Sequence, residues 1–194
     1  MSYHKENLKE QLIEIAWEIC NAGSWQKVNM RRVAEQAGVS TTAFYRHFKS
    51  KSDLQVELMM RGFAIIEEGR KDLDKFSSYG AHYIRFGLAY PHIYDLMFGN
   101  IGLDMSQHPE LVSKFDEAFA GIIEGIKPWM PDASERDQMI KALNIWASVH
   151  GLVGILRRGI VPVNKADTLR WIENNLEDYL EMTTLLKGGL NKDV

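Results

Sequence analysis

The sequence has few of the features that mark secreted, membrane or β-sheet proteins. Its single cysteine, Cys20, cannot form a disulfide within the chain, so the fold does not depend on oxidation and we expect a cytoplasmic location. No uninterrupted apolar run approaches the roughly 18 residues of a membrane-spanning helix. The first residues are too polar for a secretory signal, and we expect no membrane partner. No stretch alternates between apolar and polar residues with a period of two, which argues against β-strands.

Patterns that carry catalysis or bind metals are also missing. The HExxH and CxxC spacings of metal sites do not occur, and His82, His92 and His108 are scattered along the chain. We find no nucleophile paired with a base and no glycine-rich loop of the kind that cradles phosphate. The sequence therefore predicts no catalytic residues, no metal site and no cofactor. A small helical enzyme with an apolar active site stays open as an alternative function.

Apolar residues recur at helical spacing along the chain, which predicts an all-α protein of about nine helices. Asn29, Ser40 and Ser134 are expected to cap the starts of helices, and Gly23 and Gly38 to end them. With their caps included, the expected helices cover residues 5–22, 29–37, 40–47, from Ser50 or Ser52 past Phe63, 78–90, 91–98, 109–126, 134–158 and 165–187.

Positive charge is concentrated in one segment of a chain whose net charge is −3. Residues 27–51 contain six cations and one acid, Glu35, so the rest of the chain is acidic. A basic segment on an acidic body is typical of a module that binds phosphate, such as the backbone of a nucleic acid. A solvated basic face, or a face that binds an acidic protein, would have the same charge pattern.

Residues 29–51 predict a helix-turn-helix, in which two short helices are joined by a tight turn. The small Ala34 allows the two helices to approach each other, and Gly38 permits the turn. The second helix presents short or hydrogen-bonding side chains suited to phosphates and base edges, namely Ser40, Thr41, Thr42, Tyr45 and His47. The flanking residues Arg31, Lys49 and Lys51 add positive charge where a DNA backbone would lie.

The pattern AxxAGVSxxAFYRHFxSKxDL, from Ala34 to Leu54, resembles the N-terminal domain of the tetracycline-repressor (TetR) family of bacterial transcription regulators. The resemblance covers about residues 5–60. It implies phosphate contacts by Tyr45, His47 and Lys51, contacts to bases or the adjacent backbone by Arg31, Thr41 and Thr42, and a place near the same groove for Ala43. An ordinary helical hairpin with a basic edge is the alternative.

A second resemblance covers the C-terminal part of the chain. The segments YIRFGLAYPHIYDLMFG (83–99) and WASVHGLVGIL (146–156) resemble the TetR C-terminal domain type that is named for its Trp-His-Gly signature. Trp146, His150 and Gly151 carry that signature here.

Aromatic and methionine residues are frequent after the helix-turn-helix, and together they can enclose an apolar effector pocket. Core packing needs the same residue types, so each residue is also a candidate for the core. The candidate pocket residues are Phe63, Tyr83, Phe86, Met97, Phe98, Phe119, Met139, Trp146 and His150. His150 is either the polar anchor of that pocket or a core histidine bonded to a neighbouring helix.

The last two long helices carry apolar stripes wider than a monomer with few flanking helices can cover. In the TetR family the equivalent pair forms a four-helix interface with its twin across a two-fold axis. The candidate interface residues are Leu152, Ile155, Leu169, Ile172, Leu176 and Tyr179. The alternative is that these helices cover only their own core.

The two resemblances imply a homodimeric, ligand-responsive DNA-binding regulator, in this family most often a repressor. The DNA-binding domain is expected over residues 1–52, with the helix-turn-helix at about 29–49, and a helical effector-binding and dimerisation domain over residues 53–194. The expected partners are double-stranded DNA with a palindromic operator, a second copy of the chain and a small apolar or amphipathic effector. A protein-interaction module is the alternative to DNA binding.

Overall fold

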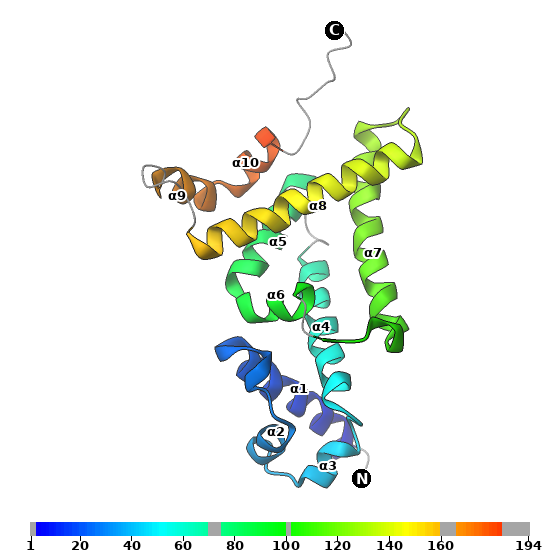
Figure 1. The fold of residues 1–194 in the computed structure, drawn as a ribbon, viewed down its shortest axis with the longest axis vertical. Helices are drawn as coiled ribbons and strands as arrows, with labels where there is room; N and C mark the ends of the chain where they lie inside the picture. Colours follow the sequence, from blue (N-terminus) through cyan, green and yellow to red (C-terminus); the bar gives the residue numbers. More distant parts are fainter. Residues whose placement is uncertain (1–2, 70–74, 100–101, 160–165, 184–194) are drawn as a thin grey trace, which may run out of the picture. The chain divides into compact units, whose positions relative to one another are not determined.

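A computed structural model describes residues 3–69, 75–99, 102–159 and 166–183, and these form α-helices, short 3-10 helices and no β-strand (Figure 1). The all-α class is therefore confirmed. The α-helices are α1 (Tyr3–Gly23), α2 (Met30–Gln36), α3 (Thr41–Tyr45), α4 (Lys51–Glu68), α5 (Phe76–Ala89), α6 (Pro91–Phe98), α7 (Pro109–Ile126), α8 (Glu135–Arg158), α9 (Ala166–Asn174) and α10 (Leu176–Thr183). The 3-10 helices are η1 (Trp25–Lys27), η2 (Met105–Gln107) and η3 (Lys127–Trp129).

Side-chain caps set helix boundaries where the sequence predicted them. At the start of α2, Asn29 Oδ1 accepts a hydrogen bond from the backbone N–H of Arg31 at 2.9 Å. Ser40 and Ser134 cap α3 and α8 through their hydroxyl oxygens. Gly159 ends α8 with a φ of 59°, a left-handed conformation that suits a residue without a Cβ. These caps satisfy backbone groups that a helix end leaves unpaired.

The last helix predicted from the sequence is divided into two helices in the structure. One helix was expected over residues 165–187, but its described part consists of α9 and α10, separated at Asn175. The Asn175 side chain donates a hydrogen bond to the carbonyl oxygen of Trp171 at 2.8 Å, and its backbone N–H donates to that of Ile172 at 3.1 Å. Asparagine side chains compete with helical hydrogen bonds in this way. Residues 184–187 lie outside the described residues.

The chain divides into two compact units. Unit 1 comprises Met1–Ile65 and Tyr90–Lys114, and unit 2 comprises Ile66–Ala89 and Phe115–Val194. Unit 1 therefore extends beyond the DNA-binding domain expected over residues 1–52. Because the units are defined by packing and the expected boundary by function, that boundary stays a prediction.

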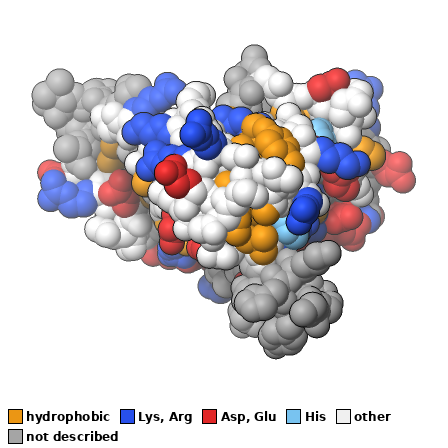
Figure 2. Space-filling model, turned by 90° about the horizontal axis from the view of Figure 1, so that it is seen from below, with side chains coloured by type: hydrophobic (Ala, Val, Ile, Leu, Met, Phe, Trp, Pro, Cys, Tyr) orange, Lys and Arg blue, Asp and Glu red, His pale blue; other side chains and the backbone are white. Residues whose placement is uncertain are grey.

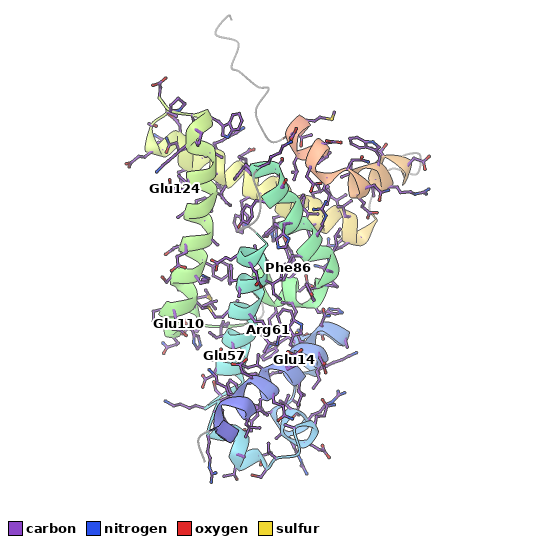
Figure 3. All side chains as sticks on the ribbon, turned by 180° about the vertical axis from the view of Figure 1, so that it is seen from behind. Glu14, Glu57, Arg61, Phe86, Glu110 and Glu124 are labelled. Atoms are coloured by element: carbon purple, nitrogen blue, oxygen red, sulfur yellow. The ribbon has the colours of Figure 1, made fainter. Side chains whose placement is uncertain are left out.

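In unit 1, α1 packs on α2, α6 and η1. The largest fully buried side chains of this unit are Leu12, Val28, Phe44, Phe48, Leu54, Leu58, Ile93, Leu96 and Leu111. Two ion pairs join α1 to α4, namely Lys9 with Glu57, and Glu14 with Arg61 at an N–O distance of 2.6 Å (Figure 3). Arg61 also lies 4.8 Å from the ring centre of Trp17. These contacts hold the helix that follows the helix-turn-helix against α1.

Unit 2 is built on α5, which packs against α8 and α10. The approach of α10 is close, because a Cβ at Gly80 of α5 would lie 3.0 Å from a methyl carbon of Leu180. A buried cluster joins α7 to α8 and consists of Ile122, Ile126, Ala142 and Ile145.

Among the described residues, α8 is the one helix that is long and apolar enough, by length and composition, to cross a membrane. An 18-residue window of it has a mean hydropathy of 1.4, and 33% of that window is buried. The window is not an uninterrupted apolar run, because Lys141 and His150 stand within it. One face of α8 contributes Ala142 and Val149 to the core of unit 2, and another apolar face stays exposed.

Candidate nucleic-acid interface

The helices α2 and α3 form the predicted helix-turn-helix. Gly38, in the turn between them, has a φ of 68°, which a glycine adopts without strain. The backbone N–H groups of Gly38 and Val39 donate to the carbonyl oxygens of Glu35 and Ala34, each at 3.0 Å. Ala34 is 1% exposed, so a larger side chain there would have to displace its buried neighbours.

Burial of one aromatic residue orients the short helix α3. Phe44 is fully buried and packs on Phe48, with the ring centres 5.2 Å apart. Because α3 has five residues, this burial turns its other side chains outward. Ser40, Thr41, Thr42 and Tyr45 are exposed, and Ala43 and His47 are partly exposed. The predicted contacts on and beside α3 are thus accessible to DNA, and their individual roles stay predictions.

Further cations flank α3. Arg31, a predicted contact, is exposed at the first turn of α2, and Lys49 is exposed after α3. Arg32 and Arg46, which belong to the basic segment but were not predicted as DNA contacts, are exposed too, and no ion pair among the described residues involves them. Figure 2 shows Lys and Arg side chains, with some Asp and Glu side chains among them, around uncharged surface. The basic composition of residues 27–51 was the signal for these residues.

Lys51 differs from the other predicted contacts because its ammonium group is bound within the protein. Nζ donates a hydrogen bond to the carbonyl oxygen of Trp25 at 3.3 Å and lies 4.5 Å from the centre of the Trp25 ring. Partial burial lowers the pKa of Lys51 below its ordinary value. The nearby Cys20 is buried, and this burial raises the pKa of its thiol to about 12. Cys20 is therefore no nucleophile at neutral pH.

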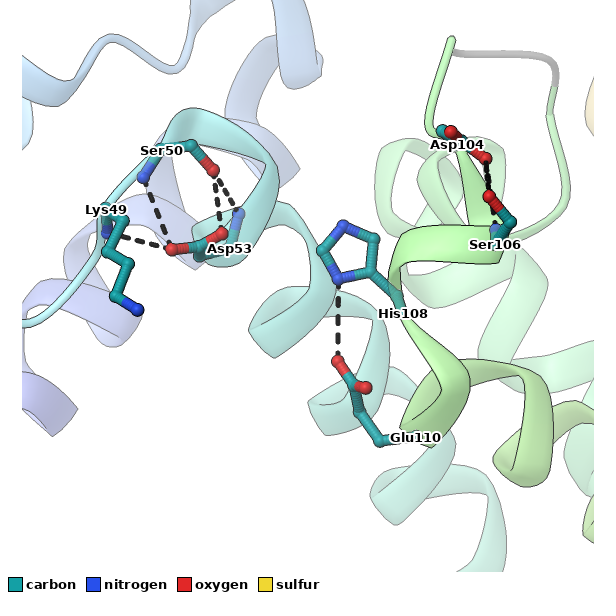
Figure 4. Close-up of polar contacts among 7 residues, drawn as sticks. All are labelled: Lys49, Ser50, Asp53, Asp104, Ser106, His108 and Glu110. Atoms are coloured by element: carbon teal, nitrogen blue, oxygen red, sulfur yellow. Dashed lines mark hydrogen bonds and ion pairs between the residues drawn. The ribbon is translucent and has the colours of Figure 1, made fainter.

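A capping box opens α4 directly after the helix-turn-helix (Figure 4). Ser50 Oγ accepts a hydrogen bond from the backbone N–H of Asp53 at 3.1 Å. The Asp53 carboxylate accepts in turn from the Ser50 hydroxyl at 2.7 Å and from the backbone N–H of Lys49 at 2.8 Å. The bond from the Ser50 hydroxyl is the largest cause of the lowered pKa of Asp53. At the start of α7, His108 Nδ1 lies 3.5 Å from Glu110 Oε1. Figure 4 shows this pair.

We expect Asp53→Ala to lower the free energy of unfolding at pH 7 by about 1 kcal/mol, as is typical for a lost helix cap. Folding lowers the Asp53 pKa below 3.8, so its contribution to stability is present above that value and is lost as the pH falls through the folded-state pKa. Urea unfolding of wild type and variant should therefore differ at pH 7 and converge in acid. Ser52→Ala, beside the box, is the control. A difference that does not change with pH would contradict this role.

The predicted effector residues fall into both compact units. In unit 1, Phe63 and Met97 are buried, and the ring centre of Phe98 lies 6.2 Å from that of Phe63. A Cβ at Gly62 would collide with the Met97 sulfur, so α4 and α6 approach closely here. In unit 2, Phe86 is buried as well. These side chains pack as core residues do.

A row of aromatic side chains connects α7, α8 and α5 in unit 2. The ring centres of Phe119 and Trp146 lie 6.4 Å apart, and those of Trp146 and His150 lie 5.7 Å apart. The Tyr83 hydroxyl lies 3.3 Å from His150 Nδ1. Burial lowers the pKa of His150, so its imidazole is neutral at neutral pH. Met139, another predicted pocket residue of α8, is 48% exposed.

The structure divides the predicted interface residues between core and surface. Leu152, Ile172 and Leu176 are at most 9% exposed in the single chain. They are buried within the protomer, where Leu152 and Leu176 lie on α8 and α10, which both pack against α5, and Ile172 lies on α9. This burial disfavours an interface role for the three, and that role stays a prediction. The other three, Ile155, Leu169 and Tyr179, are exposed or partly exposed.

A different face of α8 is apolar and uncovered by the described chain. Ile140, Leu143 and Ile155 are 55%, 52% and 43% exposed, and Ala147 and Gly151 between them are exposed as well. Residues three and four positions apart share one face of a helix, so these five residues form a continuous line, the α8 stripe. The same spacing was the signal in the sequence, although the interface prediction included only Ile155 of this stripe.

Two family profiles match the sequence. "Bacterial regulatory proteins, tetR family" matches residues 12–58, and "Tetracyclin repressor-like, C-terminal domain" matches residues 76–179. The nucleoid occlusion factor SlmA of Idiomarina loihiensis is 24% identical over 146 residues, which cover 71% of this chain and 74% of SlmA. A protein with unknown function from Rhodococcus sp. RHA1 has a TM-score of 0.68 at 20% identity, covering 89% of this chain and 94% of its own. AibR, in complex with isovaleryl coenzyme A and operator DNA, has a TM-score of 0.59 at 13% identity, covering 90% of this chain and 97% of its own.

Proposed function

The chain belongs to the TetR family of bacterial regulatory proteins, and we propose that it acts as a homodimeric repressor that a small molecule releases from its operator. The observation that carries this proposal is the exposed, hydrogen-bonding surface of α3 within a basic helix-turn-helix. Family and fold point to a transcription regulator rather than to an enzyme. The Trp-His-Gly subtype stays a prediction.

The short α3 favours DNA binding by two copies of the chain. A helix of five residues reads few base pairs, so two copies on successive major-groove faces multiply the affinity. A two-fold dimer implies a palindromic operator with half-sites about 34–36 Å apart, or a multiple of that distance. The α8 stripe supports the dimer, because contiguous exposed apolar surface marks interaction sites.

An effector would act by binding the DNA-competent and the released states with different affinities. The structural likeness to AibR, whose structure contains both a ligand and operator DNA, supports such a response. The aromatic row of unit 2 suits an apolar or amphipathic molecule, since Phe119, Trp146 and His150 are partly exposed. A regulator of this kind acts at the nucleoid, in the bacterial cytoplasm.

Selection of bound sequences from a random duplex pool tests the proposal. We expect enrichment of palindromic sites with two half-sites, and an affinity that falls steeply with salt concentration. The protein-interaction alternative would be favoured if no sequence were enriched and an acidic protein bound instead. The enzyme alternative would require turnover of a bound molecule in the absence of DNA.

Replacing Thr41 or Thr42 with alanine should change which sequences are selected. A lost base contact costs about 1–3 kcal/mol, so the preference at one or two operator positions should weaken while binding to unrelated duplexes stays the same. Thr168→Ala, which alters an exposed threonine of α9, is the matched control. Identical selected sites for wild type and both variants would show that these threonines do not read bases.

A further inference from the structure

Lys51 joins the two ends of the helix-turn-helix. It is the first residue of α4, directly after the segment that contains α3. Its Nζ donates to the carbonyl oxygen of Trp25, which also accepts a hydrogen bond from the backbone N–H of Val28 at 3.0 Å. Val28 precedes Asn29, the cap of α2. One side chain therefore connects the entrance of α2 with the exit of α3.

The contact combines a hydrogen bond from a charged donor with a contact to an aromatic ring. The donor is a cation, and charge-assisted hydrogen bonds are stronger than neutral ones. Nζ also lies 4.5 Å from the centre of the Trp25 ring, and tryptophan is the best aromatic partner for a cation. Trp25 is 7% exposed and Lys51 is half-buried, so the contact is partly shielded from water.

Backbone strain occurs beside this contact. Ser24 has a φ of 139°, and it is the one non-glycine residue with a positive φ among the described residues. Such a conformation persists only where the surrounding contacts hold it. The neighbouring Trp25 is held by its burial and by Lys51, and the Ser24 N–H donates to the Cys20 carbonyl at 2.8 Å. The turn before α2 thus depends on contacts made from outside it.

The side chain of Lys49 is exposed, unlike that of Lys51. Its backbone N–H is fixed by the Asp53 carboxylate, whereas its side chain is exposed and forms no ion pair with a described acid. A phosphate could bind this ammonium group without breaking a contact in the protein. The same phosphate could bind Lys51 Nζ only in competition with the Trp25 carbonyl and ring.

We propose that Lys51 is a positioning residue, a clasp that closes the helix-turn-helix and fixes the orientation of α3, and that Lys49 makes the phosphate contact on this connection. This role departs from the phosphate contact that the family resemblance implies for Lys51. The inference rests on the DNA binding proposed above. It adds that two neighbouring lysines serve that binding by different means.

Two matched variants of the full chain separate these roles. Lys49→Met and Lys51→Met each keep an unbranched side chain and remove one positive charge. The slope of log affinity against log salt concentration counts the cations that neutralise phosphates. On the selected operator we expect Lys49→Met to lower the magnitude of this slope by about one without changing the melting temperature. Lys51→Met should leave the slope unchanged, lower the melting temperature and weaken operator binding several-fold.

Lys51→Arg and Trp25→Leu complete the test. Arginine keeps the charge, the donors and the stacking, so Lys51→Arg should restore the melting temperature. In a Trp25→Leu background, Lys51→Met should lower the melting temperature less than it does in the wild type, because the ring contact is already lost. A slope reduced by about one in Lys51→Met, or an unchanged melting temperature, would overturn the proposal. If the wild type binds no duplex in a salt-dependent manner, the DNA-binding function fails, and the melting temperatures still decide whether the clasp exists.

Discussion

Leu143→Glu should convert the dimer into a folded monomer that has lost its specific affinity for the operator. Leu143 is 52% exposed in the single chain and lies in the α8 stripe between Ile140 and Ala147. Burying an unpaired carboxylate in an apolar interface costs several kcal/mol, which is comparable to much of an association energy. At about 1.4 kcal/mol for each factor of ten, operator affinity should fall at least about 100-fold. Weak, salt-sensitive binding through one helix-turn-helix should persist.

Sedimentation gives the mass and a duplex titration gives the affinity. Val112→Glu is the matched control, because it puts the same charge on a 37% exposed apolar residue of another helix, α7. We expect this control to stay dimeric. A Leu143→Glu variant that sediments as a dimer and binds its operator would exclude the α8 stripe from the interface. A wild-type chain that is monomeric at micromolar concentration would refute the dimer itself.

Helix boundaries set by short-range hydrogen bonds could be predicted from the sequence. Asn29, Ser40 and Ser134 each bond to a backbone N–H two or three residues further on, so the residues that decide the cap are neighbours in the sequence. The glycine conformations at Gly38 and Gly159 are local in the same sense. The helix-turn-helix and the start and end of α8 were therefore predictable.

The break between α9 and α10 could not be predicted in this way. Asn144 stands in the middle of α8, exposed to solvent, and the helix continues through it. Asn175 instead bonds to the Trp171 carbonyl and ends α9. The residue type is the same at both positions, so an asparagine alone does not decide whether its side chain competes with the helix.

The helical periodicity predicted which apolar residues share one face of a helix, but not which element covers that face. Leu152 and Leu176 have the spacing of an interface stripe and turn out to be buried in unit 2. Ile140 and Leu143 have similar spacing and are exposed. The hydropathy of a residue does not say which helix packs against it, and here the position of α5 decides. For Lys51, likewise, a contact with Trp25, 26 residues earlier in the chain, sets the direction of the side chain.

Leu176→Glu should destabilise the fold itself, unlike the same substitution at Leu143. Leu176 is 1% exposed, and its helix α10 packs on α5. The lost burial of a leucine costs about 2–5 kcal/mol, and an unpaired buried carboxylate adds to that cost. The ion pair between Arg85 and Glu177 cannot compensate, because exposed pairs contribute at most about 1 kcal/mol. For a chain of this size the melting temperature should fall by about 10 °C or more.

Thermal unfolding followed by circular dichroism measures this effect, and two controls fix its cause. Met182→Glu puts the same charge on the same helix at a residue that is 71% exposed, and it should melt close to the wild type. Leu176→Met nearly conserves volume and should cost less than about 1.5 kcal/mol. If α10 is buried, stability should decrease from the wild type to Leu176→Met and again to Leu176→Glu. Equal melting temperatures for Leu176→Glu and Met182→Glu would mean that α10 is not packed on α5, and would favour the interface role predicted for Leu176.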